Sequence, residues 1–374
     1  MKKCLLVCSS FYPAYKSGGP ARSLTNLVSL LEERVEFDVF TSDRDMNSKP
    51  FSNINVNSWE NLFKSARVFY KSPDISIFTC LKTFKNKKYD CVFLNSFFDF
   101  RFSIIFLVLH FFGMIKASEI ILAPRGELSH GAMSLKPMKK KLFLHIFKFL
   151  GFSKVVTFNF TSEIEAKEAR EYLGDVNYKL VPNMHGKIPD FKKKNKKPGE
   201  LKLIFLSRIS EKKNLHVVLE TLSQINCGEV FFKIAGVIDD QKYWSRCQNI
   251  LNFLPSNIHV EYLGAIDQKK VHKELQESHA FFLPTLNENY GHAIVEAMIN
   301  SNMIIISDQT PWSEVSHHGG IVENLNDSSK YSFHLKSLLA LTDEEYEAKA
   351  RSTYEYCASV LEKNKINISK LFND

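Results

Sequence analysis

Short apolar runs with strand-like composition alternate along this chain with runs of helical periodicity, and this alternation constrains the fold most. In the first half, the strand-like runs cover residues 3–9, 35–41, 66–70, 91–95, 120–123 and 154–160. The helical runs cover residues 20–33, which begin with a proline, and residues 163–173, which follow Ser162 as a candidate N-cap. Alternation of this kind is typical of α/β proteins with parallel sheets.

The pattern is interrupted once and then restarts. Residues 187–200 have no apolar periodicity, contain two prolines and a lysine cluster, and indicate a linker. Strand-like runs follow at residues 203–207, 230–235, 259–263, 281–284 and 303–307, with helical runs at 215–223 and 243–253 and a helical tail from about 344 to 372. We therefore predict two doubly wound, Rossmann-like domains that face a central cleft.

The predicted boundaries follow from this interruption. Residues 1–186 form an N-terminal domain, residues 201–352 form a C-terminal domain, and residues 353–374 form a helix that we expect to pack back on the N-terminal domain. A length of 374 residues fits two domains. Hydrophobic residues make up 44% of the chain and charged residues 24%, which indicates a globular protein and not a disordered one.

The net charge and the cysteine content limit the partners and the cellular compartment that fit this chain. The net charge of +8 fits an anionic ligand, an anionic membrane surface or nucleic acid. Seven cysteines without a CxxC spacing indicate reduced thiols in a cytosolic protein. The longest apolar stretch, residues 102–115, is shorter than the ~20 residues of a spanning helix. We therefore expect a cytoplasmic protein without a transmembrane segment, and an interfacial or buried helix at residues 102–115 is the alternative.

Two charged strings in the second half follow strand-like runs and lead into helices. Arg208 and Lys213 follow the first strand of the predicted C-terminal domain, and Glu288 and Glu296 flank the start of a later helix. Ligands bind outside the carboxyl ends of the strands in such sheets. Two cations suit a phosphate and carboxylates suit hydroxyl groups, so the set fits a nucleotide sugar. The alternatives are a solvated basic loop and a carboxylate on the helix surface.

A glycine pair occupies the corresponding place in the first half. Ser17-Gly18-Gly19-Pro20 follows the first strand and opens the first helix. Glycines let the backbone approach a ligand closely, and the start of a helix favours an anion. The string is not GxGxxG, so a nicotinamide cofactor is not supported. A purely structural βα turn is the alternative.

In their order and placement, these strings resemble the retaining GT-B glycosyltransferases of family 4, of the bacterial surface-polysaccharide type. The resemblance covers nearly the whole chain. It rests on the glycine turn, the Arg208/Lys213 string and the Glu288-x7-Glu296 string. Weaker matches are Thr161-Ser162-Glu163, Val181-Pro182-Asn183, Gly236, Thr310-Pro311-Trp312 and Glu314.

The resemblance implies a role for each matching residue. Arg208 and Lys213 would hold the donor diphosphate and neutralise the leaving group, Glu296 would bind the ribose, and Glu288 would lie beside the transferred sugar. Asn289, Tyr290, Gly291 and His292 would bind the donor, mainly through amides that cap its phosphates. Gly18 and Gly19 would approach the donor phosphate and the acceptor from the other domain. The resemblance implies no metal. It also implies no cofactor, because the nucleotide sugar is a substrate.

The sequence departs from the resemblance at one strand end. Many of these enzymes carry a histidine there, whereas this chain reads Pro124-Arg125-Gly126-Glu127. We expect Arg125 to bind a phosphate of the donor or the acceptor, and Glu127 to act as the acceptor base. The alternative is that Arg125 only caps the sheet.

Other motifs carry weaker signals. Asp43-Arg44-Asp45 is a DxD string, which we interpret as a loop with solvated carboxylates and not as a metal site. His317-His318 is interpreted as a polar turn, because the histidines show no metal-ligand spacing.

Residues 136–154 predict an amphipathic basic helix. Lys136, Lys139, Lys140, Lys141 and Lys148 interleave with apolar residues between Leu142 and Leu150. We expect this segment to contact an anionic membrane surface on the cytoplasmic face, and an ordinary helix packed on the sheet is the alternative.

The function favoured by these patterns is the retaining transfer of a sugar from a nucleotide-diphosphate donor. The acceptor would be a lipid-linked glycan in bacterial O-antigen, capsule or exopolysaccharide synthesis. A nucleotide-sugar epimerase or a phosphorylase on the same fold stays open, and so does a non-enzymatic basic protein that binds membranes or nucleic acid. We expect no nucleic acid partner, because the basic residues gather in a linker and one helix and not in a groove interleaved with aromatic residues.

Overall fold

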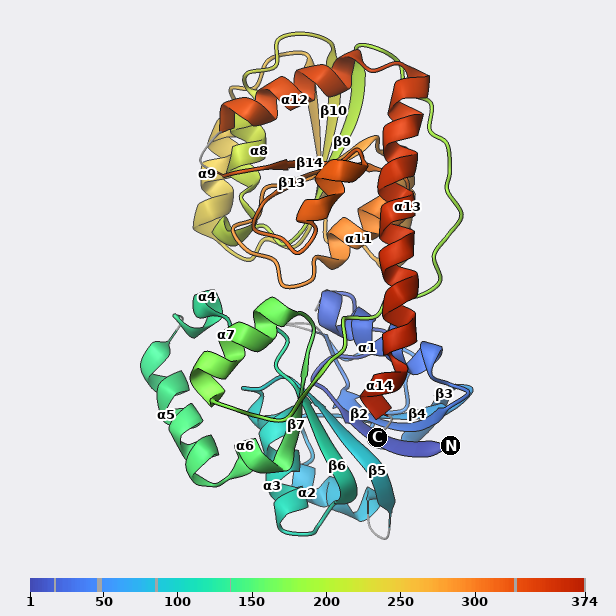
Figure 1. The fold of residues 1–374 in the computed structure, drawn as a ribbon, viewed down its shortest axis with the longest axis vertical. Coiled ribbons are helices and arrows are strands. Elements are labelled where there is room, and N and C mark those ends of the chain that lie inside the picture. Colours follow the sequence, from blue (N-terminus) through green and yellow to red (C-terminus); the bar gives the residue numbers. More distant parts are fainter. Residues whose placement is uncertain (17, 46–48, 85–86, 135, 326–327, 373–374) are drawn as a thin grey trace. The chain divides into compact units, whose positions relative to one another are not determined.

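The computed structural model describes residues 1–16, 18–45, 49–84, 87–134, 136–325 and 328–372. The chain divides into two compact units: unit 1 comprises residues 1–186 and 363–374, and unit 2 comprises residues 187–362. Each unit contains a mainly parallel sheet with helices against it (Figure 1), as the alternation of strand-like and helical runs predicts. The predicted fold class, two parallel-sheet α/β domains, is confirmed.

Unit 1 is built on an eight-stranded sheet with the order β3-β4-β2-β1-β5-β6-β7-β8. Its strands are β1 (Lys2–Val7), β2 (Val35–Ser42), β3 (Trp59–Phe63), β4 (Ala66–Lys71), β5 (Lys88–Asn95), β6 (Lys116–Ala123), β7 (Val156–Phe160) and β8 (Tyr178–Leu180). Among the described strands of this sheet, β3 alone pairs antiparallel, with β4. The sequence did not predict β3 or β8, because both are short and lie at the edges of the sheet.

The helices of unit 1 cover both faces of this sheet. They are α1 (Gly19–Leu30), α2 (Ile77–Cys80), η1 (Leu81–Thr83), η2 (Phe100–Ile104), α3 (Ile105–Phe111), α4 (His130–Met133), α5 (Pro137–Phe149), α6 (Phe152–Val155), α7 (Glu163–Leu173) and α14 (Ser369–Phe372). Alternate residues of β1 belong to different cores: Leu5 and Val7 pack in one cluster, whereas Cys4 and Leu6 pack in the other. This alternation is expected of a strand that is buried on both sides.

The predicted N-cap at Ser162 is confirmed. Its hydroxyl accepts a hydrogen bond from the amide of Glu165 at 3.1 Å, and α7 begins at the next residue. The predicted helix over residues 163–173 therefore matches α7.

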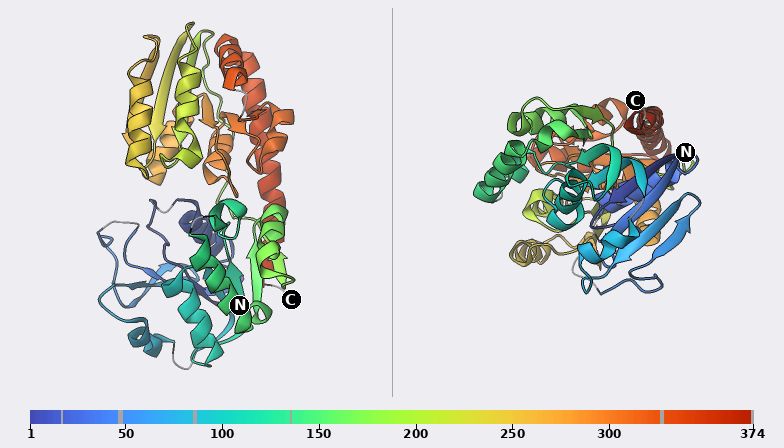
Figure 2. Two further views of the ribbon diagram at one scale, coloured as in Figure 1. Left: turned by 90° about the vertical axis from the view of Figure 1, so that its left-hand side faces the viewer. Right: turned by 90° about the horizontal axis from the view of Figure 1, so that it is seen from below.

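Unit 2 is built on a six-stranded parallel sheet with the order β11-β10-β9-β12-β13-β14. Its strands are β9 (Glu200–Leu206), β10 (Glu229–Ala235), β11 (Ile258–Gly264), β12 (Ala280–Leu283), β13 (Met303–Ser307) and β14 (Ile321–Glu323). Its helices are η3 (Glu211–Lys213), α8 (Leu215–Leu222), α9 (Gln241–Leu251), α10 (Gln268–Glu277), α11 (His292–Ile299), η4 (Ser313–His318) and α12 (Ser328–Ala340). Helix α13 (Asp343–Asn367) continues beyond unit 2 into the last residues of the chain. Figure 2 shows helices on both faces of the unit 2 sheet.

The lysine-rich segment before β9 is an extended chain that packs on unit 2. Lys194 and Lys196 are buried in it. The Lys194 ammonium donates to the carbonyls of Leu275 at 2.8 Å and Ser278 at 2.5 Å, at the end of α10. The Lys196 ammonium donates to the carbonyl of Leu339, in the last turn of α12, at 3.2 Å. Two of the lysines therefore satisfy carbonyls at helix ends, where a cation is favoured.

Candidate functional site

Two loops of unit 2 that carry predicted site residues lie side by side. They follow β9 and β12, which are parallel neighbours with Ile204 opposite Phe281. The carbonyl of Lys212 in the first loop accepts hydrogen bonds from the second: one from the Leu286 amide at 2.8 Å and one from the Thr285 hydroxyl at 3.0 Å. The two loops are therefore fixed to each other at the carboxyl edge of the sheet, where α/β sheets bind ligands.

Lys213 and Glu288 form an ion pair between these loops, in which the lysine ammonium donates to a carboxylate oxygen. Only 11% of the Lys213 side chain and 19% of the Glu288 side chain are exposed. Burial and the neighbouring charge of Lys213 lower the pKa of Lys212. The structure thus places one predicted cation and one predicted carboxylate in direct contact.

Arg208 lies in the same loop as Lys213 but is far more open to solvent. Its guanidinium forms an ion pair with Asp239, with 3.3 Å between Nη1 and Oδ2, and both side chains are about half exposed. Asp239 follows β10, the other neighbour of β9. An exposed pair of this kind contributes little to stability, so the guanidinium can exchange its partner for a phosphate.

Gly291 is the N-cap of α11 and lies in the left-handed region, with φ of 77°. A Cβ atom at this position would lie 2.8 Å from Cδ1 of Ile294 and 3.2 Å from Cγ of Glu288. The backbone conformation therefore favours glycine, and a Cβ atom would also displace the side chain of Ile294. The first amides of a helix have no partner within the helix, so those after Gly291 suit an anion.

Tyr290 precedes Gly291 and packs in the core of unit 2. Its side chain is buried, and its ring lies 5.9 Å from that of Trp312 and 4.6 Å from that of His292. The Trp312 indole donates to the Tyr290 carbonyl at 2.5 Å. The aromatic side chains therefore hold the turn from Asn289 to His292 in place.

Glu296 lies in α11, four residues after its first residue, and is only 4% exposed. The alternative interpretation of Glu296 as a carboxylate on the helix surface is therefore wrong. A carboxylate at this depth is suited to hold hydroxyl groups, because it offers acceptors only.

Gly18 in unit 1 is the N-cap of α1, with φ of 69°, and no atom lies within 4 Å of the place of a Cβ. Here the backbone conformation alone requires glycine, and the space beside it is open. Gly19 is the first residue of α1. Ser17 of the same string lies outside the described residues.

The loop before this glycine turn is tied down by a residue of the DxD string. One oxygen of Asp45 accepts from the amides of Tyr15 at 2.8 Å and Lys16 at 2.6 Å. Asp43 pairs with Arg44, with 2.7 Å between Oδ1 and Nε. Both carboxylates are buried, so the predicted solvated loop is wrong. Within the described ranges, no group of three or more His, Cys, Asp or Glu side chains could hold a metal ion.

Glu127 holds a loop in place. Its carboxylate accepts hydrogen bonds from the Ser96 hydroxyl at 2.7 Å and from the amides of Phe97 and Phe98 at 2.6 and 2.9 Å. Burial raises the pKa of Glu127. Because three donors already occupy this carboxylate, the geometry favours fastening the loop after β5 over service as the acceptor base.

Arg125 follows β6, and two asparagine side chains hold its guanidinium. Nε donates to Asn95 at 2.8 Å, and Nη1 donates to Asn183. Sequence reasoning overlooked Asn95, although its place at the end of β5 was a signal. In unit 2, the structure joins Lys213 to Glu288, places Arg208 in the same loop as Lys213 but paired with Asp239, and places Glu296 in α11. Gly18, Gly19, Arg125 and Glu127 lie in unit 1.

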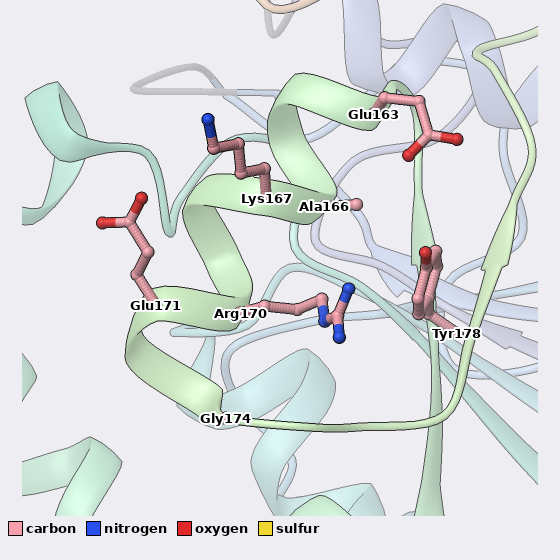
Figure 3. A pocket seen from close by; sticks show the side chains of 7 residues that line it. All are labelled: Glu163, Ala166, Lys167, Arg170, Glu171, Gly174 and Tyr178. Atoms are coloured by element: carbon pink, nitrogen blue, oxygen red, sulfur yellow. The ribbon is translucent and has the colours of Figure 1, made fainter.

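A hollow of ≈ 350 Å³ lies elsewhere on unit 1, between α7 and β8 (Figure 3). Its lining includes Glu163, Lys167, Arg170 and Tyr178 but none of the predicted site residues. The Arg170 guanidinium lies 5.6 Å from the Tyr178 ring and pairs with Asp175 at 3.2 Å. This surface carries mixed charge, and we assign no function to it.

The second half of the chain matches a known protein family. Residues 187–355 match the family model of the glycosyl transferases group 1. Solved structures similar to the whole chain include Anabaena HepE in complex with UDP and glucose, with a TM-score of 0.71, 14% identity and 99% of each chain covered. Sucrose-phosphate synthase from Thermosynechococcus elongatus also has a TM-score of 0.71 and 14% identity, covering 100% of this chain and 98% of its own.

A third similar structure is the trehalose 6-phosphate synthase of Burkholderia multivorans, with a TM-score of 0.65, 11% identity and 99% of each chain covered. No curated protein sequence matches. The chain is a glycosyltransferase with the GT-B fold. The group 1 match falls within unit 2, so it is the unit with the Lys213–Glu288 pair that carries the glycosyltransferase signature. None of the described helices of this glycosyltransferase is long and apolar enough to cross a membrane.

Proposed function

We propose that this glycosyltransferase is a retaining enzyme of family 4 that uses a nucleotide-diphosphate sugar as donor. Its acceptor would be a lipid-linked glycan in bacterial O-antigen, capsule or exopolysaccharide synthesis. The observation that carries the proposal is the cluster at the carboxyl edge of the unit 2 sheet. There, Lys213 contacts Glu288, and Arg208 follows β9, the strand that precedes Lys213. The backbone amides in the first turn of α11 follow Glu288 in the chain.

Each group has a task in this reaction. Arg208 and Lys213 bind the donor diphosphate and stabilise the negative charge that develops as it departs. The amides after Gly291 add neutral donors to the same phosphates. Glu296 accepts hydrogen bonds from the ribose hydroxyls, and Glu288 lies beside the transferred sugar. Gly18, beside which no atom lies within 4 Å of the place of a Cβ, leaves room for close approach of a substrate, and Gly19 continues this turn into α1. The UDP and glucose bound to the Anabaena protein of the same fold support a donor of this class.

A thermal-shift screen tests the donor class. The protein is melted with UDP, GDP, ADP or dTDP, each with and without the attached sugar, and with the corresponding nucleosides. A ligand that binds only the native state raises the melting temperature, and the rise grows with the logarithm of the ligand concentration relative to its Kd. We expect one diphosphate to raise the melting temperature and its nucleoside to leave it unchanged. If all four diphosphates leave it unchanged, the donor assignment fails.

Helix α5 supports a place at a membrane surface, because it has two apolar faces. One face packs on unit 1 through Leu144 and Phe147, which are buried. On the opposite side, Met138, Leu142 and Phe149 are exposed by 85%, 62% and 83%. Their spacing of four and seven residues forms one stripe along the helix.

Lysines border this exposed stripe on both sides. At 100° per residue, Lys139 lies on one edge of it, and Lys141 and Lys148 lie on the other. Lys140 is an exception to the predicted set, because its ammonium donates to the Ala132 carbonyl at 2.7 Å and lies 4.9 Å from the Phe98 ring. No acidic residue occurs between Glu127 and Glu163. An apolar stripe between cations matches an anionic bilayer surface.

A second segment extends this apolar surface. Phe111 and Phe112, at the end of α3, are more than half exposed. The Phe111 ring lies 5.7 Å from that of Phe152, which follows α5 in the chain. We therefore place the membrane-facing surface over the exposed stripe of α5 and the turn after α3, and we propose a peripheral location on the inner face of the cytoplasmic membrane.

Co-sedimentation with vesicles tests this location. Wild-type protein should pellet with vesicles that contain anionic phospholipid and stay in solution with purely zwitterionic ones. The triple variant Lys139→Gln, Lys141→Gln, Lys148→Gln should lose about 1 kcal/mol of binding free energy for each lysine near the surface. Lys140→Gln is the matched control and should bind as wild type does. Equal binding of the triple variant and wild type would exclude the lysine edges from the interaction.

A further inference from the structure

The Arg125 guanidinium of unit 1 is surrounded by neutral partners. Nε donates to the Asn95 side-chain oxygen at 2.8 Å, Nη1 donates to that of Asn183, and the Phe93 ring lies 5.8 Å from the guanidinium carbon. An arginine has five N–H donors in a planar fork. Two are used here, which leaves three. Within the part of the chain that the structure describes, Arg125 forms no ion pair.

Two carboxylates that fix the loops around Arg125 accept hydrogen bonds from other donors. Glu127 is occupied by the Ser96 hydroxyl and two backbone amides. Glu165 is buried, and its oxygens accept from the amide of Gly126 at 2.5 Å and from the amide and hydroxyl of Thr161 at 2.7 and 2.6 Å. These two carboxylates fix the turn that carries Arg125, and they leave its positive charge unneutralised by direct contact.

The backbone conformation at Arg125 is also unusual. Its φ of 55° lies in the left-handed region, which is uncommon for a residue other than glycine. Backbone conformations of this kind persist where surrounding contacts fix them, and they cluster at ligand sites. Burial also lowers the pKa of Arg125 to about 10, as expected where a charge has lost water without gaining an anion.

We propose that Arg125 is an anion site for a phosphate of the acceptor, with Asn95 and Asn183 as the residues that position its fork. This inference rests on the proposed function, because it names the chemical class of the acceptor. The donor diphosphate already has Arg208 and Lys213 in unit 2, so a further cation in unit 1 suits a different phosphate. A diphosphate that links a glycan to a lipid and a phosphate on a free sugar both present this chemistry.

Asn183 connects this site to the glycine turn. Its side-chain oxygen accepts from Arg125 and also from the Ser23 hydroxyl at 3.1 Å, and Ser23 lies in the first turns of α1. One neutral acceptor thus fixes the guanidinium relative to the helix that begins after Gly18. An asparagine performs this task without cancelling the charge, whereas an aspartate at the same place would neutralise the arginine.

Calorimetric titration of the full chain with inorganic phosphate tests the site. The Lys213→Ala variant serves as background, so that the cation pair of unit 2 contributes little. In this background, Arg125→Gln should raise the Kd for phosphate at least 10-fold, and Arg125→Lys should raise it less, because an ammonium lacks the bidentate fork. Arg101→Gln, at an exposed arginine of the same unit, is the matched control and should leave the Kd unchanged.

Two further measurements keep the inference separate from the donor assignment and from misfolding. Asn183→Ala leaves the charge in place and should also raise the Kd for phosphate, while nucleoside diphosphates shift the melting temperature as in wild type. If no nucleotide binds but phosphate binding still depends on Arg125, the donor proposal fails and the anion site stands. If Arg125→Lys and Asn183→Ala both bind phosphate as the background does, the anion site is overturned.

The source of the phosphate is resolved with two soluble probes. Geranyl diphosphate represents a lipid-linked diphosphate, and glucose 6-phosphate represents a phosphorylated sugar. Whichever binds more tightly than inorganic phosphate, and loses that advantage in Arg125→Gln, identifies the source. If neither binds more tightly than inorganic phosphate, the assignment of this site to the acceptor is wrong.

Discussion

Lys213 in unit 2 and Arg125 in unit 1 both follow a strand of a parallel sheet, but their partners differ in kind. Lys213 is in contact with the carboxylate of Glu288, and Arg208 beside it pairs with Asp239. Arg125 is held by the amide oxygens of Asn95 and Asn183. Carboxylates of the protein therefore neutralise the positive charges of Lys213 and Arg208, whereas the charge of Arg125 has only neutral hydrogen-bond partners.

This difference determines how much binding free energy a phosphate gains at each cation. A phosphate that arrives at Lys213 replaces a carboxylate, so its net gain is the difference between two ion pairs. Further donors, such as the amides after Gly291, are then needed for tight binding. A phosphate at Arg125 gains the whole interaction, because no anion has to leave. Unit 2 should accordingly discriminate among ligands more sharply than unit 1.

The largest effect is expected when the paired cation is removed. Lys213→Ala takes away a diphosphate partner and leaves Glu288 without its cation in a largely buried place. A hydrogen bond to a charged group contributes roughly 1.5–3 kcal/mol, so the Kd for the preferred nucleoside diphosphate should rise about 10- to 100-fold. Isothermal titration calorimetry measures this change.

Lys212→Gln is the control for that variant. Lys212 is the next residue, and its backbone carbonyl, not its side chain, joins the two loops. The glutamine variant should therefore bind the diphosphate within about twofold of wild type, an effect below the ~1 kcal/mol of one ordinary hydrogen bond. Equal loss in both variants would mean that positive charge in general, and not the Lys213 position, determines binding.

Much of the fold follows from sequence, because it is encoded locally. Periodicity predicts strands such as β13 at residues 303–307 and helix α7 after its Ser162 cap. The charged strings after β9 and β12 could also be found, since strand ends in parallel sheets are identifiable from the alternation.

The contacts that fix the candidate sites could not be predicted in this way. Asp45 holds the amide of Tyr15 from 30 residues away, and Glu165 holds that of Gly126 from 39 residues away. Each joins loops after different strands, so the partner depends on how those loops fold and not on local spacing. Whether a carboxylate such as Glu127 is free to act as a base is likewise decided by such contacts.

The neighbouring residues Lys193 and Lys194 differ in the same way in their partners, and this difference affects stability. Lys194 is buried among carbonyl oxygens and pairs with no carboxylate of the described residues, and burial lowers its pKa well below the usual value. Lys193 pairs with Asp343 and Glu347, and these hydrogen bonds raise its pKa. A lowered lysine pKa means that the native state binds fewer protons than the unfolded state below pH ~10.4, so the free energy of unfolding rises with pH in that window.

Urea denaturation at pH 7, 8 and 9 measures this slope. Lys194→Met should flatten the rise relative to wild type, because it removes the group whose proton affinity changes on folding. Lys193→Gln should keep the rise, since the raised pKa of Lys193 affects stability only above the unfolded value. A wild-type stability that is flat or falls from pH 7 to pH 9, with Lys194→Met unchanged, would contradict the expected sign of the slope.

The smallest effect is expected at the exposed pair. Asp239→Asn removes the carboxylate that competes with a diphosphate for Arg208, so binding should become tighter. Exposed ion pairs contribute about 0.2–1 kcal/mol, which corresponds to an improvement of roughly 1.5- to 5-fold in Kd. The gain should shrink as salt is raised from 50 to 500 mM, because screening weakens the original pair as well. Weaker binding by this variant would show that Asp239 positions Arg208 for its ligand and does not compete with that ligand.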